Sequence, residues 1–164
     1  MAELSRSNLH TRDMQSKDLS AVLQLERNAQ QTPWSRLSFE ESLTRKHRCR
    51  VVENGNDIVA FSIVCPVLDE LHILNLVAAP AWQGHGLGHW LMQDILDYAH
   101  STATCRLLLE VRASNDIARG LYEKWQFKQI AVRKDYYRTQ DKRRENALVF
   151  MRELQPVSAA ISGQ

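Results

Sequence analysis

The sequence predicts a mixed α/β fold with about seven strands and four helices, the helices covering both faces of one sheet. Two observations support this. Strand-like apolar runs and segments with apolar residues three and four positions apart follow one another in the order β-α-α-β-β-β-α-β-α-β-β. At 164 residues, with 44% hydrophobic and 24% charged residues, the chain has the size and composition of one ordinary globular domain.

Capping and turn residues divide the first part of the chain. Ser16 and Ser35 can each accept a hydrogen bond from the first turn of a helix. The run Asn54-Gly55-Asn56-Asp57 is a strong hairpin turn, and Pro66 is expected to end the strand that follows it. The predicted elements are a strand over 9–14, helices over 16–28 and 35–43, and strands over 49–53 and 58–64.

Two apolar strands and two helices are predicted next. Leu71–Val77 is apolar almost throughout, so we expect a central strand, which Pro80 ends. Arg106–Val111 has the same character but carries one carboxylate, and Asn115 can cap the helix after it. The apolar face of that helix would comprise Ile117, Ala118, Leu121, Tyr122 and Trp125. Residues 127–132 and 147–151 are expected to pair around a polar, basic loop.

The composition disfavours several classes of protein. A net charge of +2 is too small to argue for a nucleic-acid partner, and no apolar run has the length of a membrane span. Three cysteines without metal-ligand spacing indicate reduced thiols in a cytoplasmic protein that binds no metal. We expect a flexible N-terminus over 1–8, a single domain over 9–154 and a disordered tail over 155–164.

The most informative stretch is Gln83-Gly84-His85-Gly86-Leu87-Gly88-His89, which leads into a predicted helix. Glycine at every second position opposes a regular helix or strand. A glycine turn that opens a helix presents backbone N–H groups without partners, and the helix dipole adds a charge of about +0.5 there. Such a turn favours a phosphate group. The run lacks the third glycine of a dinucleotide fingerprint and the lysine and hydroxyl of a P-loop.

This run resembles the pyrophosphate loop of the GNAT acetyltransferases, Gln/Arg-x-x-Gly-x-Gly/Ala, with Gln83, Gly86 and Gly88 in its fixed places. A second block, Glu110-Val111-Arg112-Ala113-Ser114-Asn115 followed by Leu121-Tyr122-Glu123, closely resembles the RimI-type ribosomal-protein-alanine acetyltransferases of that family. The resemblance extends from about Leu9 to Leu154. It implies a GNAT-like fold of about seven mostly antiparallel strands with a splayed parallel central pair.

The resemblance also implies acetyl-CoA as co-substrate and direct transfer to an amine in a ternary complex. Glu110 would accept a proton from the amine, and Tyr122 would give one to the departing sulfur, each worth about 10²- to 10⁴-fold in rate. The residues implied in cofactor binding are the run 83–89, the backbone of Leu76, Val77 and Ala78, and Asn115.

The residues alone leave other interpretations open. Glu110 could be a strand-end glutamate paired with Arg112 or with solvent, because an unpaired buried carboxylate is costly. Tyr122 could be an ordinary core residue, and Asn115 could be only a helix cap. Glu70, which alternates with apolar residues on its strand, is a second candidate for the base.

For the acceptor, the resemblance places Trp34, Tyr136 and Tyr137 in a peptide-binding groove and points to the N-terminal alanine of small-subunit ribosomal protein eighteen. Arg138 replaces a usual proline, Lys142–Asn146 replaces a more acidic turn, and Gln126 replaces a glycine. These differences put acceptor preference in doubt more than cofactor use. Alternatives are acetylation of a lysine side chain or small amine, and a non-catalytic module that binds acyl-CoA or RNA. We expect no membrane association and no direct nucleic-acid binding.

Overall fold

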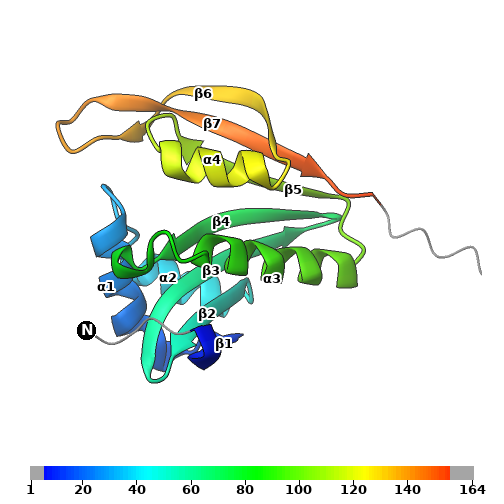
Figure 1. Cartoon of the computed structure of the whole chain (residues 1–164). Helices are drawn as coiled ribbons and strands as arrows, with labels where there is room; N and C mark the ends of the chain where they lie inside the picture. Colours follow the sequence, from blue (N-terminus) through cyan, green and yellow to red (C-terminus); the bar gives the residue numbers. More distant parts are fainter. Residues whose placement is uncertain (1–5, 156–164) are drawn as a thin grey trace, which may run out of the picture. The chain divides into compact units, whose positions relative to one another are not determined.

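The computed structural model describes residues 6–155 as seven strands, four α-helices and three short 3-10 turns (Figure 1). The strands are β1 (Leu9–Asp13), β2 (Arg48–Asn54), β3 (Asp57–Val67), β4 (Glu70–Ala78), β5 (Arg106–Arg112), β6 (Lys128–Arg138) and β7 (Arg144–Glu153). The helices are α1 (Leu19–Ala29), α2 (Arg36–Thr44), α3 (Leu87–Ser101) and α4 (Asp116–Lys124), and the 3-10 turns are Arg6–Asn8, Ser16–Asp18 and Pro80–Trp82.

Hydrogen bonding orders the strands β1-β2-β3-β4-β5-β7-β6. The pairs β1–β2, β2–β3, β5–β7 and β6–β7 are antiparallel, whereas β4 and β5 are parallel. The prediction of a mostly antiparallel sheet with a parallel central pair is confirmed. The expected flexible ends fall mainly on residues 1–5 and 156–164, which lie outside the described residues.

The chain divides into two compact units. The first contains the described residues up to Val64 together with Asn75–Leu91, and the second contains Cys65–Leu74 together with the described residues from Met92 onward. No helix within residues 6–155 has the length and apolarity that a bilayer span requires.

In the first unit, helices cover both faces of β2 and β3. Val51 and Phe61 point to one face, where they pack with residues of α1 and α2 such as Phe39. The next residue of β2, Val52, points to the other face and packs with Leu87 at the start of α3. Burial on both faces explains why these strands are apolar runs rather than alternating ones.

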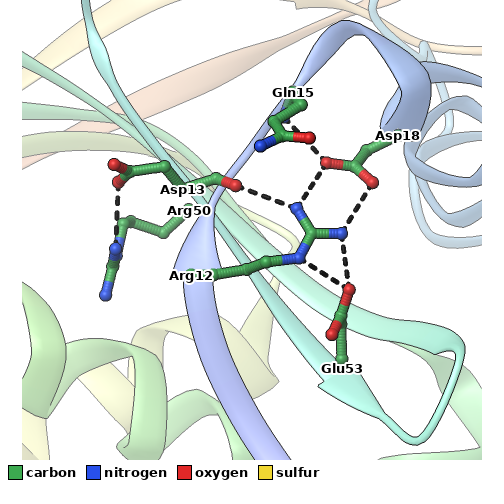
Figure 2. Close-up of polar contacts among 6 residues, drawn as sticks. All are labelled: Arg12, Asp13, Gln15, Asp18, Arg50 and Glu53. Atoms are coloured by element: carbon green, nitrogen blue, oxygen red, sulfur yellow. Dashed lines mark hydrogen bonds and ion pairs between the residues drawn. The ribbon is translucent and has the colours of Figure 1, made fainter.

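Arg12 of β1 joins three segments of the first unit (Figure 2). Its guanidinium donates to both carboxylate oxygens of Asp18, at 2.7 and 2.8 Å, and its Nε donates to Glu53 Oε1 at 2.6 Å. The Gln15 N–H also donates to Asp18 Oδ2, at 2.7 Å. The hydrogen bonds from Arg12 lower the pKa of the Asp18 carboxyl, although burial opposes the shift. An ionised carboxylate therefore anchors the start of α1 to β1 and β2.

The predicted cap at Ser35 is confirmed, because its side chain accepts a hydrogen bond from the Ser38 N–H at 3.2 Å. The predicted cap at Ser16 is wrong. Gln15 caps a 3-10 turn there, and α1 begins only at Leu19.

Other expectations from apolar patterns are also wrong. Ile117, assigned to the apolar face of α4, is 78% exposed. Strand β3 continues through Pro66 to Val67, because both residues lie at its exposed end, where the missing N–H of proline costs little.

Replacing Asp18 by asparagine is expected to lower the free energy of unfolding at pH 7 by about 2 kcal/mol, because charge-assisted hydrogen bonds are lost. The folded-state pKa of Asp18 is lowered, so its contribution is present above the unfolded pKa of about 3.8 and is lost as the pH falls through the folded value. Urea unfolding at several pH values should therefore show a difference in the free energy of unfolding between wild type and variant that disappears in acid.

The matched control is Asp13→Asn. Asp13 pairs with Arg50 at 2.9 Å, but its side chain is 83% exposed. This variant should change stability by no more than about 0.5 kcal/mol. Equal losses in the two variants, or a gap that does not depend on pH, would contradict the role of the Arg12–Asp18 contact.

Candidate active site

Glu110 lies on the half-exposed face of β5. Leu107, Leu109 and Val111 are buried, and the residues between them, Glu110 included, are only partly buried. Glu110 Oε1 accepts a hydrogen bond from Arg133 Nη1 of β6 at 2.7 Å. The two-residue period of the strand places the carboxylate on the partly buried face, where it has a cationic partner, and not among the buried side chains.

Arg112, the partner considered for Glu110 from the sequence, contacts a different carboxylate. Its Nη1 donates to Glu145 Oε1 of β7 and to the Arg138 carbonyl, both at 2.9 Å. Glu145 Oε2 also accepts a hydrogen bond from the Ser114 N–H at 3.2 Å. Burial opposes ionisation of Glu145, but the hydrogen bonds from Arg112 and Ser114 prevail and lower its pKa. This contact ties the β6–β7 hairpin to the turn between β5 and α4.

Tyr122 of α4 is buried, with 7% of its surface exposed. Its ring centroid lies 5.7 Å from that of Phe127 and 6.4 Å from that of Phe150. Burial, with a smaller contribution from Tyr137, raises the pKa of the Tyr122 phenol to about 12. The phenol is therefore protonated at neutral pH. Tyr122 is a core residue of its unit, and it retains a proton that it can donate.

The tyrosine pair lies in β6 beside a β-bulge. The register of β6 and β7 shifts between Arg133 and Tyr137. Within the bulge, Asp135 has φ 52°, and its N–H donates to Asn146 Oδ1 at 3.1 Å. Bulges redirect side chains near functional sites. The predicted loop is thus shorter than expected, since β6 runs to Arg138 as an exposed strand that lacks the alternation on which prediction depends.

An arginine stacks on each tyrosine ring. The Arg133 Cζ lies 4.0 Å from the Tyr136 ring centroid, and the Arg112 Cζ lies 4.6 Å from that of Tyr137. The two rings meet edge to face at 5.1 Å. Burial, followed by the charge of Glu110, raises the pKa of Tyr137 to about 12. Tyr137 therefore lies within electrostatic reach of both Glu110 and Tyr122.

Asn115 is confirmed as the cap of α4, because its Oδ1 accepts a hydrogen bond from the Ala118 N–H at 3.1 Å. At the other end of α4, Gln126 stands where the family resemblance has glycine. It adopts the left-handed conformation at φ 66°, which glycine would reach without strain.

Glu70 lies on the partly buried face of β4, bonded to His72 Nε2 at 3.1 Å and to Arg106 Nη1 at 3.3 Å. Strand pairing sets Glu70 opposite Arg106 in β5. Glu110 is four residues further along β5, which corresponds to about 13 Å. That separation is too large for the two carboxylates to act on one amine.

The glycine run opens α3 as predicted. Gly84 and Gly86 both have φ 80°, and the Trp90 N–H makes the first helical hydrogen bond, to the Gly86 carbonyl at 2.9 Å. Two of the predicted phosphate-binding amides have other partners. The Gln83 N–H donates to Pro80 O at 3.2 Å, and the His85 N–H donates to Trp82 O at 3.1 Å. The amides of Gly86, Leu87 and Gly88 precede the helical ladder and fit a phosphate group.

The strand end before this loop is anchored by a buried carboxylate that the sequence analysis missed. Glu26 of α1 is 0% exposed, and both its carboxylate oxygens accept hydrogen bonds from Asn75 Nδ2 at 3.1 Å. Its Oε2 also accepts the Trp34 N–H at 2.9 Å. After Asn75, Val77 is buried, while Leu76 and Ala78 are half-buried on the opposite face. Trp34 packs on Phe39, with ring centroids 5.2 Å apart.

Comparison with known proteins identifies the family. Residues 16–127 match the sequence model described as the Acetyltransferase (GNAT) family. The chain belongs to the GNAT acetyltransferase family.

Relatives and solved structures agree with this assignment. The chain is 34% identical over 137 residues to the [ribosomal protein bS18]-alanine N-acetyltransferase of Escherichia coli K12, an alignment that covers 83% of this chain and 91% of that protein. The Haemophilus influenzae protein of the same name is 35% identical over 133 residues, covering 80% and 90%. The crystal structure of the Escherichia coli ribosomal-protein-S18-alanine N-acetyltransferase matches with a TM-score of 0.85 and 30% identity, over 93% and 97% of the two chains.

As a GNAT acetyltransferase, the protein is an N-acetyltransferase that uses acetyl-CoA as co-substrate. Among residues 6–155, no group of three or more His, Cys, Asp or Glu side chains is placed to hold a metal ion. The structure adds two residues that the sequence analysis did not identify, Arg133 and Glu26. Neither has a sequence signal, because Arg133 meets Glu110 only across the intervening strand β7, and the contacts of Glu26 depend on the packing of α1 against β4.

Asn75→Ala is expected to lower the free energy of unfolding by about 1–3 kcal/mol at pH 7, because it removes hydrogen bonds from the buried Glu26 carboxylate. Burial raises the pKa of Glu26, so its contribution to stability is present at low pH and is lost as the pH rises through the folded value. Without Asn75 the pKa of Glu26 rises further, so the loss of stability in the variant relative to wild type should grow with pH.

Urea unfolding at several pH values measures this deficit. The control Asn28→Ala removes a hydrogen bond from Gln24 Nε2 on the exposed side of α1 and should change stability by no more than about 0.5 kcal/mol. A deficit that stays constant with pH would mean that Asn75 acts by packing rather than by stabilising the carboxylate.

Proposed function

We propose that this enzyme transfers the acetyl group of acetyl-CoA to the N-terminal α-amino group of a ribosomal protein in the cytoplasm, with the N-terminal alanine of bS18 as its acceptor. The observation that carries the proposal is the 34% identity over 83% of the chain to a protein named for this activity. The position of Glu110 and Tyr122 in one unit supports a mechanism for it.

Glu110 is proposed as the proton acceptor. An α-amino group has a pKa of about 8, so only about a tenth is unprotonated at pH 7 and able to attack a thioester. A carboxylate has two oxygens, so Glu110 can keep its contact with Arg133 through Oε1 while the other oxygen accepts the amine's proton, directly or through a water. Because this carboxylate is half-exposed, protons can then leave to solvent.

Tyr122 is proposed as the donor to the departing sulfur. Acetyl-CoA supplies the acetyl group as a thioester when it is bound. A thiol has a pKa of roughly 8.5, so complete transfer of a proton from a phenol with a pKa of about 12 is unfavourable. We therefore assign to Tyr122 a hydrogen bond that stabilises negative charge on the sulfur as the C–S bond breaks, with protonation completed from solvent.

Transfer is proposed to proceed without an acyl-enzyme. Cys49, Cys65 and Cys105 are free thiols. Burial, with a smaller contribution from Asp13, raises the pKa of Cys49 to about 11, which opposes its use as a nucleophile. Direct attack by the amine then needs only the proton acceptor and the donor to sulfur.

Binding of acetyl-CoA is proposed at the amides that open α3, with Asn115 and the backbone of Leu76–Ala78 as further contacts. The left-handed backbone at Gly84 and Gly86 fits this assignment, because it turns the chain so that the amides of the first helical turn are presented together. Tyr136, Tyr137 and Trp34 are proposed to contact the acceptor peptide. The arginines stacked on the two tyrosines hold those rings in fixed orientations.

The acceptor is tested with peptides incubated with acetyl-CoA and analysed by mass spectrometry. A peptide that begins with alanine and arginine should gain one acetyl group on its α-amine. The same peptide with a blocked N-terminus and an internal lysine should not react. Equal turnover of the blocked peptide would contradict the assignment of the α-amine and indicate a lysine side chain as the acceptor.

The proton-transfer assignment predicts that Glu110→Gln and Tyr122→Phe each lower the rate of thiol release at least about tenfold, while the Kd for acetyl-CoA changes little. Phenylalanine at position 122 keeps the ring contacts with Phe127 and Phe150. Rates are measured with a thiol-reactive dye and Kd values by calorimetry.

The matched control for Glu110→Gln is Arg133→Met, which breaks the same ion pair but leaves the carboxylate in place. Its loss of rate should be much smaller than that of Glu110→Gln. Equal losses in these two variants would mean that the ion pair, rather than proton acceptance by Glu110, accounts for the effect.

A further inference from the structure

The glycine run at 83–89 contains no lysine or arginine of its own. The structure brings a cation to it from the start of the chain. Arg6, in the 3-10 turn Arg6–Asn8 before β1, donates a hydrogen bond from Nη2 to the His85 carbonyl oxygen at 2.5 Å. The two residues are 79 positions apart in the sequence and belong to the same unit.

Gly86 allows this close approach. A Cβ at position 86 would lie 2.2 Å from Arg6 Nη2, whereas a Cβ at Gly84 would meet nothing within 4 Å. Both glycines have φ 80°, so a side chain at either position would strain the backbone equally. At position 86, unlike position 84, a side chain would also occupy the space that the Arg6 guanidinium fills.

The contact has a consequence on the opposite side of the peptide group. The His85 carbonyl and the Gly86 N–H belong to one planar trans peptide and point in opposite directions. A guanidinium bonded to the carbonyl therefore directs the Gly86 N–H away from Arg6, and it polarises that N–H as a donor. The Gly86 N–H precedes the first helical hydrogen bond of α3, so it is one of the amides that fit a phosphate group.

We propose that Arg6 is a positioning residue for the diphosphate of acetyl-CoA. It orients the His85–Gly86 peptide toward the phosphates and supplies the positive charge that the glycine run lacks. Because the Arg6–His85 contact is exposed, and salt screens exposed charges over a length of about 8 Å at physiological ionic strength, the contribution of this charge should weaken as salt is added. The inference rests on the proposed assignment of the diphosphate to this loop.

Calorimetry with CoA tests the proposal on the full chain. Arg6→Ala is expected to raise the Kd for CoA about fivefold to tenfold, and Arg6→Lys should restore part of this loss because it keeps the charge. The affinity of the wild type should fall more steeply with salt than that of Arg6→Ala. Acetyl-pantetheine, which lacks the diphosphate, serves as a second acetyl donor, and its KM should be the same in wild type and Arg6→Ala.

Two glycine variants separate this proposal from the loop assignment. Gly86→Ala displaces Arg6, so adding Arg6→Ala to it should change the Kd little further. Gly84→Ala leaves Arg6 in place, so adding Arg6→Ala to it should raise the Kd for CoA by the same fivefold to tenfold as in the wild type. If Gly86→Ala weakens CoA binding but Arg6→Ala does not, the role of Arg6 is wrong and the loop assignment stands.

Two other outcomes also overturn the proposal. If neither Gly86→Ala nor Arg6→Ala changes the Kd, the diphosphate binds elsewhere, and the loop assignment fails together with the role of Arg6. If Arg6→Ala raises the KM for acetyl-pantetheine as much as that for acetyl-CoA, Arg6 has only a general structural role.

Discussion

The second unit depends on one constraint, that β5 buries every second residue. Leu107, Leu109 and Val111 occupy the buried face, so Glu110 and Arg112 must share the other face. Each of these two opposite charges has a counter-ion from another strand: Glu145 of the adjacent strand β7 pairs with Arg112, and Arg133 of β6, the strand beyond β7, pairs with Glu110. The tyrosine pair lies against these two arginines, and the arrangement of charges and rings therefore follows from the alternation of a single strand.

The two proposed proton-handling groups differ in environment. Tyr122 is enclosed by apolar rings, which keep its proton in place. Glu110 is half-exposed and already paired with a cation. These different surroundings fit the two proposed roles, one group donating to the sulfur and the other accepting a proton, as in enzymes where two similar groups take opposite roles. Burial is the main cause of the raised pKa of Tyr137 and of Tyr122, with a contribution from the charge of Glu110 for Tyr137 and from Tyr137 for Tyr122.

The order and type of the elements could be predicted from the sequence, because long apolar runs, Ser35 and Asn115 encode local structure directly. The exposure of individual residues could not be predicted, because periodicity shows which residues share a helix face but not which face is covered. Ile117 lies on the predicted apolar face of α4 and is nevertheless exposed. Glu110 and Tyr122 were found through family resemblance. Their partners were not, because Arg133 of β6 meets Glu110 only once β7 has paired with both β5 and β6.

The bulge at Asp135 has a second consequence. Strand β6 is the last strand in the sheet order, and its residues are exposed along almost its whole length. A long, flat edge strand of this kind is a template for pairing with another polypeptide. The left-handed residue within the bulge and the adjacent charged side chains break the regular row of amides and carbonyls. The bulge beside the tyrosines therefore interrupts the edge at which another strand could pair.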